Sequence, residues 1–401
     1  MERLTILHPG AELYGADRML LATIDALKND FEVTVVVPCC GPLLAEIKAR
    51  EVPVIVFPGM VVLRKELMSV RGMAALVPRS LVSLVRLLFL MARLRPSLVY
   101  VNTVTLPLAL FAARLRGTPA ICHVHEAEVG LNPWMHSLLT VSLFLASKIV
   151  SIGAASTAFV TGRWHALARR VVVIPNGVDF PAGTKALSSV TPTLPVILVP
   201  GRLSPRKGTD LAVDAADTLS LAGRPCRVVL AGDTFPGYEW YEAELRSKVE
   251  ECGLQGIVNF AGFSQQMPEL YAAADIVLMP SRGSESFGLV AVEAMLAGRV
   301  LIASDIPGLR EVVEHGRTGW LVSPTAQSIH EAVIERLRDW DIAVKVADDA
   351  RQIASDRFGL HRYYSCILKL TRQVCPASSI GKPEGLAQCV DPGDLGKKGT
   401  Q

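Results

Sequence analysis

The sequence is poor in charged and aromatic residues, which narrows the classes of protein that it can encode. Charged side chains make up 20% and aromatic side chains 6% of its 401 residues, and the formal net charge is only +3. A charge this small provides no general basicity for binding nucleic acid, so we exclude nucleic acid as a partner. Half of the residues are hydrophobic, enough for two domains that each bury a sizeable core.

Three kinds of local signal are also missing. The eight cysteines are scattered and none forms a Cys-x-x-Cys pair, so neither a disulfide framework nor a zinc knuckle is indicated. The first residues, "MERLTILHPG", lack the basic region, apolar core and cleavage site of a signal peptide, which predicts a cytoplasmic location. A G-x-G-x-x-G fingerprint is absent as well, which argues against an NAD-dependent oxidoreductase.

Two uncharged stretches, residues 96–113 and 129–147, are long enough to cross a membrane, but prolines and polar residues interrupt them. We expect buried strands and helices there. Residues 64–95 carry seven basic residues against the single acid Glu66, interleaved with large apolar residues. This composition suits a helix that lies on an anionic membrane surface, and the solvated face of a long helix pair is an equally good interpretation.

Short β-branched apolar runs alternate with helix-compatible segments. In the first half they fall at residues 4–8, 32–37, 52–57, 98–102, 120–125, 148–153 and 170–177. After a segment rich in Pro, Gly, Ser and Thr the pattern restarts at 196–201, 227–232, 257–262, 275–280, 299–304 and 319–323. Such alternation predicts an α/β protein with two Rossmann-like domains that face each other across a ligand-binding cleft.

The domain boundaries follow from these patterns. We expect a first domain over residues 1–180, a linker over 181–195 and a second domain over 196–357. A C-terminal helix over 358–375 then crosses back to the first domain, and residues 376–401, rich in Gly, Pro, Lys and Asp, are predicted to be disordered.

Two loops that follow predicted strands have features of anion sites. "GRLSPRKGTD" carries Arg202, Arg206 and Lys207 before a helix that opens at Thr209 or Asp210, an arrangement suited to a diphosphate. In the first domain, the loop "HPGAELYGADR" places Gly15 before a helix expected after Asp17. Gly15 would let backbone amides approach a phosphate or sugar, or would merely permit the turn.

"HVHEAE" puts His123 and His125 on one face at the end of a strand, with Glu126 and Glu128 beyond. Zinc is disfavoured because further ligands at suitable spacing are missing. His125 is a candidate to hydrogen-bond a substrate hydroxyl, and a structural histidine is the competing interpretation.

The stretch "GSESFGLVAVEAMLAG" keeps two carboxylates in a largely apolar segment. Glu285 is expected in a loop at the C-terminal end of a buried strand, and Glu293 in a helix that begins near Phe287 or Gly288 and ends at Gly298. Carboxylates accept hydrogen bonds from adjacent hydroxyls such as those of a sugar or ribose. A glycosidase, whose two carboxylates flank one bond, fits this arrangement poorly.

Taken in order, five motifs resemble the retaining family-4 glycosyltransferases of GT-B fold, over nearly all of residues 1–374. They are "VIPNGVD" (173–179), "GRLSPRKG" (201–208), "LYAAADIVLMPS" (270–281), "ESFGLVAVE" (285–293) and "DIPGLREVVEHGRTGWLV" (305–322). The resemblance implies a glycosyltransferase without a metal or other cofactor.

The resemblance also implies roles for individual residues. Arg202 and Lys207 would hold the diphosphate of the donor, and Glu285 its sugar hydroxyls. His125 matches the histidine near the transferred sugar, and Gly15 the second glycine of the first-domain loop. The rest of the donor site would consist of Phe287 and Gly288, which contact sugar and phosphate through backbone amides, Leu289, and Glu293 on the ribose.

Three positions depart from the family pattern. Tyr14 replaces the first of the usual paired glycines and Asp17 the usual glutamate, which puts acceptor-side contacts in question. Arg299 stands where a proline is frequent, and we expect no consequence from it.

The predicted activity is transfer of a sugar from a nucleotide diphosphate sugar to a lipid-linked or glycan acceptor in cell-envelope or exopolysaccharide synthesis. A GT-B sugar-nucleotide epimerase and a non-catalytic nucleotide-sugar-binding partner subunit remain as alternatives. The predicted location is cytoplasmic, peripheral on the inner face of the cell membrane through residues 64–95.

Overall fold

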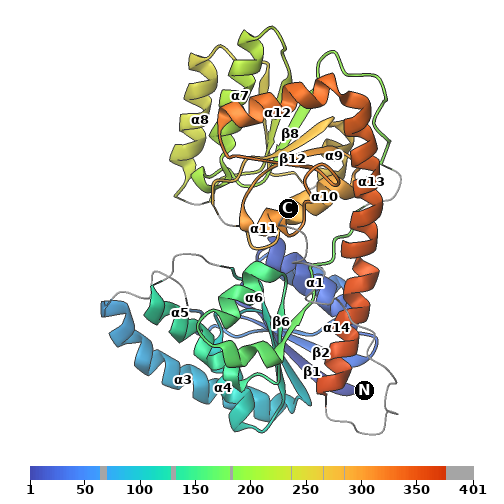
Figure 1. Cartoon of the computed structure of the whole chain (residues 1–401). Coiled ribbons are helices and arrows are strands. Elements are labelled where there is room, and N and C mark those ends of the chain that lie inside the picture. Colours follow the sequence, from blue (N-terminus) through green and yellow to red (C-terminus); the bar gives the residue numbers. More distant parts are fainter. Residues whose placement is uncertain are drawn as a thin grey trace. The chain divides into compact units, whose positions relative to one another are not determined.

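A computed structural model describes residues 1–63, 70–127, 132–180, 184–235, 237–264, 266–283 and 285–375, with the backbone alone for residues 70–76. The predicted disordered tail, Glu128 and residues 64–69 of the basic segment therefore lie outside the described residues. The chain divides into two compact units (Figure 1). Met1–Gly177 and the segment from Leu360 onward form the first unit, and Val178–Gly359 forms the second.

The first unit is built on a seven-stranded parallel sheet with the strand order β3-β2-β1-β4-β5-β6-β7. Every apolar run predicted in the first half of the chain forms one of these strands. Their near-continuous Val, Ile and Leu content follows from burial on both faces of the sheet. The bounds are β1 (Glu2–Leu7), β2 (Phe31–Val37), β3 (Val54–Val56), β4 (Leu98–Val101), β5 (Ala120–Val124), β6 (Lys148–Ser151) and β7 (Val171–Val173).

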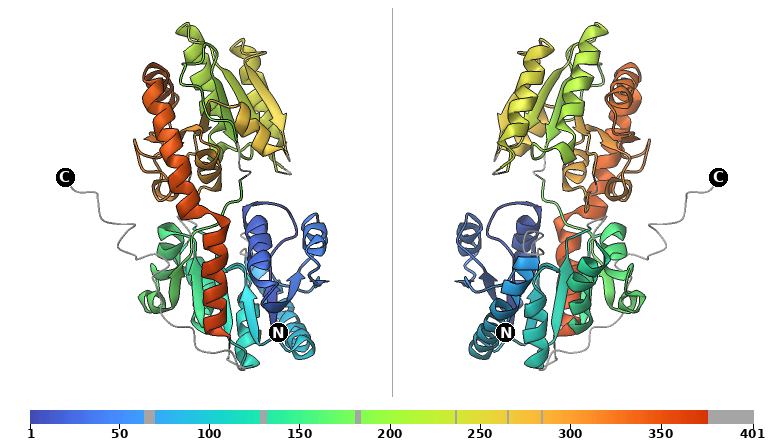
Figure 2. Two further views of the ribbon diagram at one scale, coloured as in Figure 1. Left: turned by 90° about the vertical axis from the view of Figure 1, so that its right-hand side faces the viewer. Right: turned by 90° about the vertical axis from the view of Figure 1, so that its left-hand side faces the viewer.

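Helices cover both faces of this sheet (Figure 2). One core lies under α1 and α14, and the other lies under α3, α4 and η2. The helix expected after Asp17 begins earlier, at Gly15, so Asp17 lies in its first turn. The bounds are α1 (Gly15–Leu27), α2 (Leu43–Ala49), α3 (Val70–Leu94), α4 (Pro107–Leu115), α5 (Pro133–Thr140), η2 (Val141–Leu145), α6 (Ala154–Thr161), η3 (His165–Arg170) and α14 (Leu360–Val374).

The second unit has a six-stranded parallel sheet with the order β10-β9-β8-β11-β12-β13. All six runs predicted in the second half form its strands, and one apolar core fills the unit. The strands are β8 (Val196–Pro200), β9 (Arg227–Ala231), β10 (Val258–Gly262), β11 (Ile276–Met279), β12 (Val300–Ser304) and β13 (Trp320–Val322). The helices are η4 (Pro205–Lys207), α7 (Thr209–Leu221), α8 (Glu239–Glu251), α9 (Met267–Ala273), α10 (Leu289–Leu296), α11 (Pro307–Arg310), α12 (Ala326–Arg338) and α13 (Trp340–Phe358).

Arg299 has a structural role that the sequence did not indicate. Its side chain is buried, and its guanidinium donates hydrogen bonds to the carbonyls of Ala297, Ala274 and Lys185. Trp340 likewise donates from Nε1 to Ser188 O at 2.9 Å. The described part of the predicted linker is therefore tied to the second unit by buried donors.

Within the described residues, no helix is both long enough and apolar enough to cross a membrane.

Candidate functional site

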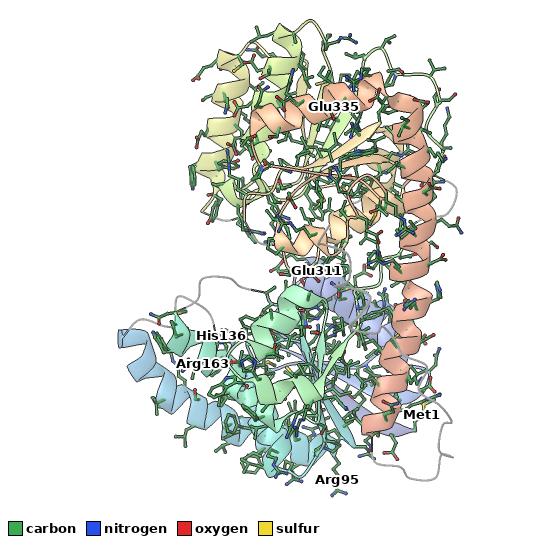
Figure 3. The ribbon with its side chains drawn as sticks, in the orientation of Figure 1. Met1, Arg95, His136, Arg163, Glu311 and Glu335 are labelled. Atoms are coloured by element: carbon green, nitrogen blue, oxygen red, sulfur yellow. The ribbon has the colours of Figure 1, made fainter. Side chains whose placement is uncertain are left out.

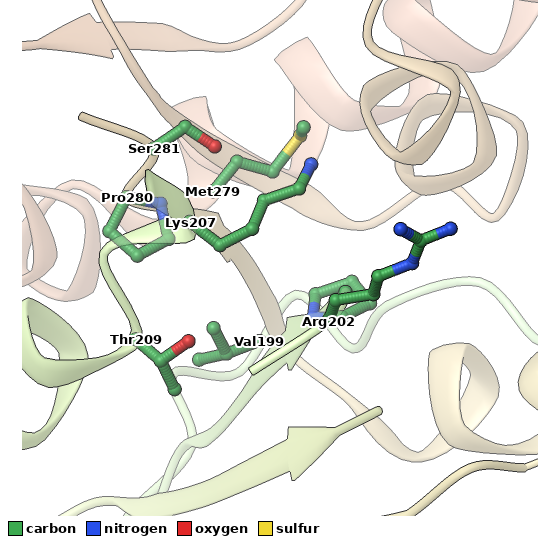
Figure 4. Close-up of a pocket in the computed structure, with 9 residues that line it drawn as sticks. Val199, Arg202, Lys207, Thr209, Met279, Pro280 and Ser281 are labelled. Atoms are coloured by element: carbon green, nitrogen blue, oxygen red, sulfur yellow. The ribbon is translucent and has the colours of Figure 1, made fainter. Parts of the chain in front are cut away.

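The best candidate for a ligand site lies at the carboxyl edge of the second sheet, where the strand order reverses between β8 and β11. Ligands of open α/β sheets bind at such switch points, because the loops after the two strands run in opposite directions and leave a crevice. The loops after β8 and β11 line a pocket there (Figure 4), formed by Val199, Pro200, Gly201, Arg202, Lys207, Thr209, Met279, Pro280 and Ser281.

Gly208 lets these two loops approach each other. Its φ is +66°, and a Cβ at this position would lie 2.0 Å from the carbonyl oxygen of Pro280. A side chain would therefore push the two loops apart. The backbone joins them as well, since the Arg282 N–H donates to Arg206 O at 2.9 Å. The predicted helix start is confirmed, because α7 begins at Thr209 directly after Gly208.

The structure brings Lys207 and Glu285 together. Lys207 Nζ lies 2.6 Å from Glu285 Oε1, and Ser281 Oγ donates to the same oxygen at 2.8 Å. Arg206 Nη1 adds a longer ion-pair contact of 3.6 Å. Glu285 is 8% exposed, so one carboxylate lies buried among two cations and a hydroxyl. Burial of a carboxylate is costly unless it is paired and hydrogen-bonded, as Glu285 is here.

Gly308 fixes the position of Glu285 from the other side. A Cβ on Gly308 would stand 1.8 Å from the carbonyl oxygen of Glu285, so the two backbones pass each other in direct contact. The site therefore depends on the "IPG" segment at residues 306–308, which comes from the last of the five family motifs.

The helix that follows Glu285 begins as predicted. Gly288 caps α10 with φ +90°, and Leu289 is its first residue, so the free amides of the helix N-terminus lie just after Glu285. Phe287 is 5% exposed and packs edge-on against Phe358, which turns its side chain into the core and leaves its backbone for any ligand contact. Gly298, with φ +64°, ends the helix as expected.

Glu293 is hydrogen-bonded to a residue outside the Glu285 cluster. Its Oε2 accepts a hydrogen bond from the Tyr271 hydroxyl at 2.8 Å. The two glutamates thus have different partners, which supports different roles for them and disfavours a pair acting on one bond.

Arg202 lines the pocket and lies over the face of Phe235, with 3.7 Å from Cζ to the ring centroid. Stacking of this kind holds a guanidinium in place while its N–H groups point outward.

A second ion pair supports the loop after β11. Arg282 donates to both oxygens of Asp210, at 2.5 and 2.6 Å, and the Tyr241 hydroxyl donates to Oδ1 at 2.7 Å. Burial opposes the charged form of Asp210, but the bonds from Arg282 and Tyr241 prevail and lower its pKa. This contact links the loop to the first turn of α7.

The remaining predicted residues, Gly15 and His125, belong to the first unit, at its own switch point between β1 and β4. There His8 follows β1 and Asn102 follows β4. Asn102 contacts His8 Nδ1 through Nδ2 at 3.0 Å and His125 Nε2 through Oδ1 at 3.0 Å. His8 Nε2 lies 2.7 Å from Asp17 Oδ1, and Gly15 opens the helix that carries Asp17.

His123 and His125 share one face, as the alternation of a strand predicts, and their ring centroids are 4.0 Å apart. Burial lowers the pKa of His125 to about 3, helped by the nearby His8 and opposed by Asp17. Burial also lowers the pKa of His123 well below its usual value and raises that of Glu126. Both rings are therefore neutral at physiological pH.

Glu126, which directly follows His125, is held by its surroundings. It accepts hydrogen bonds from Thr103 Oγ1 and from the His125 amide, the latter at 3.0 Å. Among the described residues, no three His, Cys, Asp or Glu side chains are grouped so as to hold a metal ion.

Several residues at these two sheet edges were not predicted from the sequence. Ser281 and Tyr271 were inside quoted motifs but had no assigned role, and His8 was noted only as a strand end. The one usable signal is position, because polar residues directly after a buried strand meet at the carboxyl edge of the sheet. Asn102 and Arg282 fit that description, and Tyr241, on a helix, had no such signal.

Comparison with known proteins places the chain in a family. The family model for "Glycosyltransferase Family 4" matches residues 14–180, and that for "Glycosyl transferases group 1" matches residues 188–353. The 2-deoxystreptamine glucosyltransferase of Streptomyces kanamyceticus is 30% identical over 276 residues, which are 62% of this chain and 69% of that protein.

Other relatives match over shorter stretches. The alpha-D-kanosaminyltransferase of the same organism is 30% identical over 169 residues, 41% of this chain, and the match spans 42% of that protein's length, less than half. Among solved structures, the Anabaena protein Alr3699/HepE in complex with UDP is 26% identical, with a TM-score of 0.75 over 92% of this chain and 100% of that one. The chain belongs to glycosyltransferase family 4, and its two units are the two Rossmann-like domains of the GT-B fold.

Proposed function

We propose that the protein transfers a sugar from a nucleotide diphosphate sugar, bound at the switch point of the second unit, to a hydroxyl of a glycan or lipid-linked acceptor. The observation that carries this proposal is the Lys207–Glu285–Ser281 cluster, whose Lys207 and Ser281 line one pocket together with Arg202. It offers cations for a diphosphate and a carboxylate for sugar hydroxyls. The Anabaena protein was solved in complex with UDP, which supports a nucleotide as part of the ligand.

Six of the predicted donor residues, all in the second unit, have a role in this proposal. Arg202 and Lys207 neutralise the diphosphate as it leaves, assisted by the amides of Gly288 and Leu289 at the N-terminus of α10. Glu285 accepts from hydroxyls of the transferred sugar, and Glu293 from the ribose.

Donor binding displaces part of the existing ion pair. A phosphate that approaches Lys207 competes with Glu285 for the ammonium group, and Glu285 is then available to sugar hydroxyls. The diphosphate of the donor therefore takes the place of Glu285 beside Lys207, and the sugar hydroxyls take the place of Lys207 beside Glu285. A nucleoside diphosphate without a sugar has no hydroxyls to offer Glu285 and should bind less well.

The test is thermal stabilisation of the purified protein by UDP-, GDP-, ADP- and dTDP-sugars, with NAD as the control ligand. A ligand that binds only the native state raises its stability by mass action. We expect one nucleotide class to raise the melting temperature and Glu293→Ala to abolish the rise. Stabilisation by NAD alone would contradict the donor site.

We also infer transfer with retention of anomeric configuration and without a metal ion. Support comes from the family resemblance and from two cations in the pocket that suffice for the leaving diphosphate. The proton NMR spectrum of the product formed with a chelator present tests both points, since the anomeric coupling reports the configuration. An inverted product, or activity that needs a metal, would refute them.

The product assay also separates the alternatives. An epimerase yields an isomerised sugar without an acceptor. A non-catalytic partner subunit binds the donor but turns over no acceptor. A role in cell-envelope or exopolysaccharide synthesis follows if the accepted substrates are lipid-linked or polysaccharide fragments.

Peripheral attachment to an anionic membrane is the second part of the proposal. On α3, Val77, Leu81, Val85 and Phe89 recur every fourth residue and are 47% to 71% exposed, although a helix on a sheet normally turns such residues inward. The opposite side of α3, including Leu87 and Met91, is buried in the core.

Charge on α3 favours an anionic surface. Arg79, Arg86 and Arg93 recur every seventh residue beside the apolar stripe, and the 25 residues of the helix contain no acid. None of the three forms an ion pair with another described residue. The adjoining α4 extends the surface with Phe111 and Leu115, both exposed. Apolar insertion flanked by arginines is typical of helices in the membrane interface.

Figure 3 labels two further arginines of the same unit. They are Arg95, just beyond the end of α3, and Arg163, which is stacked on Trp164.

Sedimentation with vesicles tests this attachment. The full chain should pellet with phosphatidylcholine vesicles that contain phosphatidylglycerol and not with pure phosphatidylcholine vesicles. Replacing Arg79, Arg86 and Arg93 with Gln should abolish the difference. The matched control replaces three exposed basic residues of the second unit, Arg224, Arg227 and Lys345. Equal binding to both vesicle types, or to neither, would refute the attachment.

A further inference from the structure

The first unit holds a chain of four polar side chains at its own switch point between β1 and β4. Asp17 Oδ1 lies 2.7 Å from His8 Nε2, Asn102 Nδ2 lies 3.0 Å from His8 Nδ1, and His125 Nε2 lies 3.0 Å from Asn102 Oδ1. His8 and Asn102 are 1% and 0% exposed and Asp17 is 6% exposed, so water cannot easily replace a missing partner. We propose that Asp17, His8 and Asn102 are positioning residues that fix His125 in its Nε2–H tautomer, so that Nδ1 accepts a hydrogen bond from a hydroxyl of the ligand.

The chemistry of each group fixes the direction of the chain. An ionised carboxylate only accepts, so His8 must donate to Asp17 from Nε2. The NH₂ group of Asn102, which can only donate, lies 3.0 Å from His8 Nδ1, so this nitrogen accepts and the proton of His8 stays on Nε2. The amide oxygen of Asn102 must therefore face His125, which has to carry its proton on Nε2.

Asp17 is suited to start this chain. Its second oxygen accepts from the Tyr14 backbone amide at 2.8 Å, so both carboxylate oxygens are engaged. Asp17 also lies in the first turn of α1, where the helix dipole favours a negative charge. The residue that departs from the usual family pattern, aspartate in place of glutamate, is thus the anchor of the chain.

A neutral His125 with its proton on Nε2 can only accept at Nδ1. The charged and titratable groups around it are His8, Asp17, His123 and Glu126. Burial and the nearby His8 lower the pKa of His125 to about 3, against the influence of Asp17. An acceptor nitrogen repels a phosphate oxygen and matches a hydroxyl. This last step rests on the proposed function, since it assumes a sugar or acceptor hydroxyl as the ligand.

The experiment is nitrogen NMR spectroscopy of the full chain with ¹⁵N-labelled histidine, because protonated and unprotonated ring nitrogens have well-separated shifts. The signals of His125 are identified by their loss in His125→Gln. In the unliganded protein we expect the Nε2–H tautomer, unchanged from pH 8 to pH 5. An Nδ1–H tautomer, or protonation of the ring near pH 6.5, would overturn the proposal without reference to any activity.

Asp17→Asn sharpens this test. The Tyr14 amide would hold the new carbonyl oxygen, so the new NH₂ would face His8 Nε2 and donate to it. His8 must then carry its proton on Nδ1 and donate it to Asn102. The side-chain amide of Asn102 must flip so that its NH₂ faces His125, and His125 must become the Nδ1–H tautomer. A residue that is only structural would not move a proton three side chains away. A folded Asp17→Asn protein with unchanged His125 would contradict the chain.

Tyr100→Phe is the matched control. It removes the buried hydrogen bond of 2.8 Å between the Tyr100 hydroxyl and Nδ1 of the neighbouring His123. The signals of His123 should change, and those of His125 should keep the pattern of the unaltered protein. If Asp17→Asn fails to fold, the tautomer of the unaltered protein still decides the proposal.

Addition of UDP-glucose and of UDP tests the hydroxyl. We expect UDP-glucose to shift the His125 Nδ1 signal and UDP to leave it in place. A bound UDP-glucose that causes no shift, or an equal shift with UDP, would refute the hydroxyl contact. If neither compound binds, the same comparison is made with the nucleotide sugar that stabilises the protein in the thermal test and with its sugar-free diphosphate. The tautomer in the unliganded protein is measured independently.

Discussion

The two units place different chemistry at equivalent positions of the same fold. At the switch point of the second unit a buried carboxylate is surrounded by Lys207, Arg206 and a hydroxyl. At the switch point of the first unit two histidines and an amide are aligned by one aspartate. The first arrangement suits an anion that brings its own charge, and the second suits an uncharged hydroxyl. The two units are therefore suited to different chemical groups, although their sheets share one topology.

The largest expected effect is a loss of stability when one charge of the Lys207–Glu285 pair is removed. Lys207→Met leaves Glu285 buried without its main partner, and we expect the free energy of unfolding to fall by about 3 kcal/mol. In Lys207→Met/Glu285→Gln most of this loss should be recovered, while stabilisation by the donor remains absent. Urea unfolding measures the first effect and thermal shift the second. Equal destabilisation by both variants would show that the ion pair is not the cause.

The second largest expected effect is a loss of stability when a side chain is added at Gly308, whose backbone contacts that of Glu285. In Gly308→Ala the new Cβ overlaps the Glu285 carbonyl, and overpacking of this kind should cost about 2 kcal/mol. The donor-induced thermal shift should disappear with it. Gly10→Ala in the first unit is the control, because its Cβ meets its nearest atom, Asp17 Oδ1, at 3.7 Å. If Gly308→Ala bound the donor as before, the loop position would not depend on this contact.

The stability of the first unit should depend on pH through His125. An unfolded histidine takes up a proton near pH 6.5, and burial lowers the pKa of His125 to about 3 in the folded protein. Between these values the unfolded chain binds more protons, so the free energy of unfolding falls as the pH falls from about 6.5. His125→Gln should remove up to about 1.4 kcal/mol of this loss per pH unit. Urea midpoints at pH 7 and pH 5 measure it, and parallel pH dependence in both proteins would contradict a neutral His125.

The smallest effect belongs to Glu293. Tyr271→Phe removes one hydrogen bond to the Glu293 carboxylate, which is proposed to bind the donor ribose. The loss of one such bond costs about 1 kcal/mol. We expect donor affinity to fall by about fivefold, measured by calorimetry, with the overall stability of the protein little changed. An affinity that drops as far as in Glu293→Ala would mean that Tyr271 itself contacts the donor.

Local sequence patterns predicted all the strands and the start and end of α10. They also identified Lys207 and Glu285, which lie 78 residues apart, through motifs already known in the family. The chain of Asp17, His8, Asn102 and His125 was not predicted because it depends on the strand order β1-β4-β5. Periodicity identifies strands but not their neighbours, so polar residues that meet only across a sheet have no local signature. The carbonyl contacts of Arg299 escaped prediction for the same reason.

The position of α14 has a consequence for the synthesis of the chain. This last helix packs on α1 in the first unit, where the Tyr363 and Thr23 hydroxyls are 2.6 Å apart although 340 positions separate them. When the first 177 residues leave the ribosome, the side of α1 that packs on α14 has no cover, and it gains one only after the whole second unit has been translated. The N-terminal half therefore completes its core last, and during translation it is the half exposed to aggregation and to chaperones.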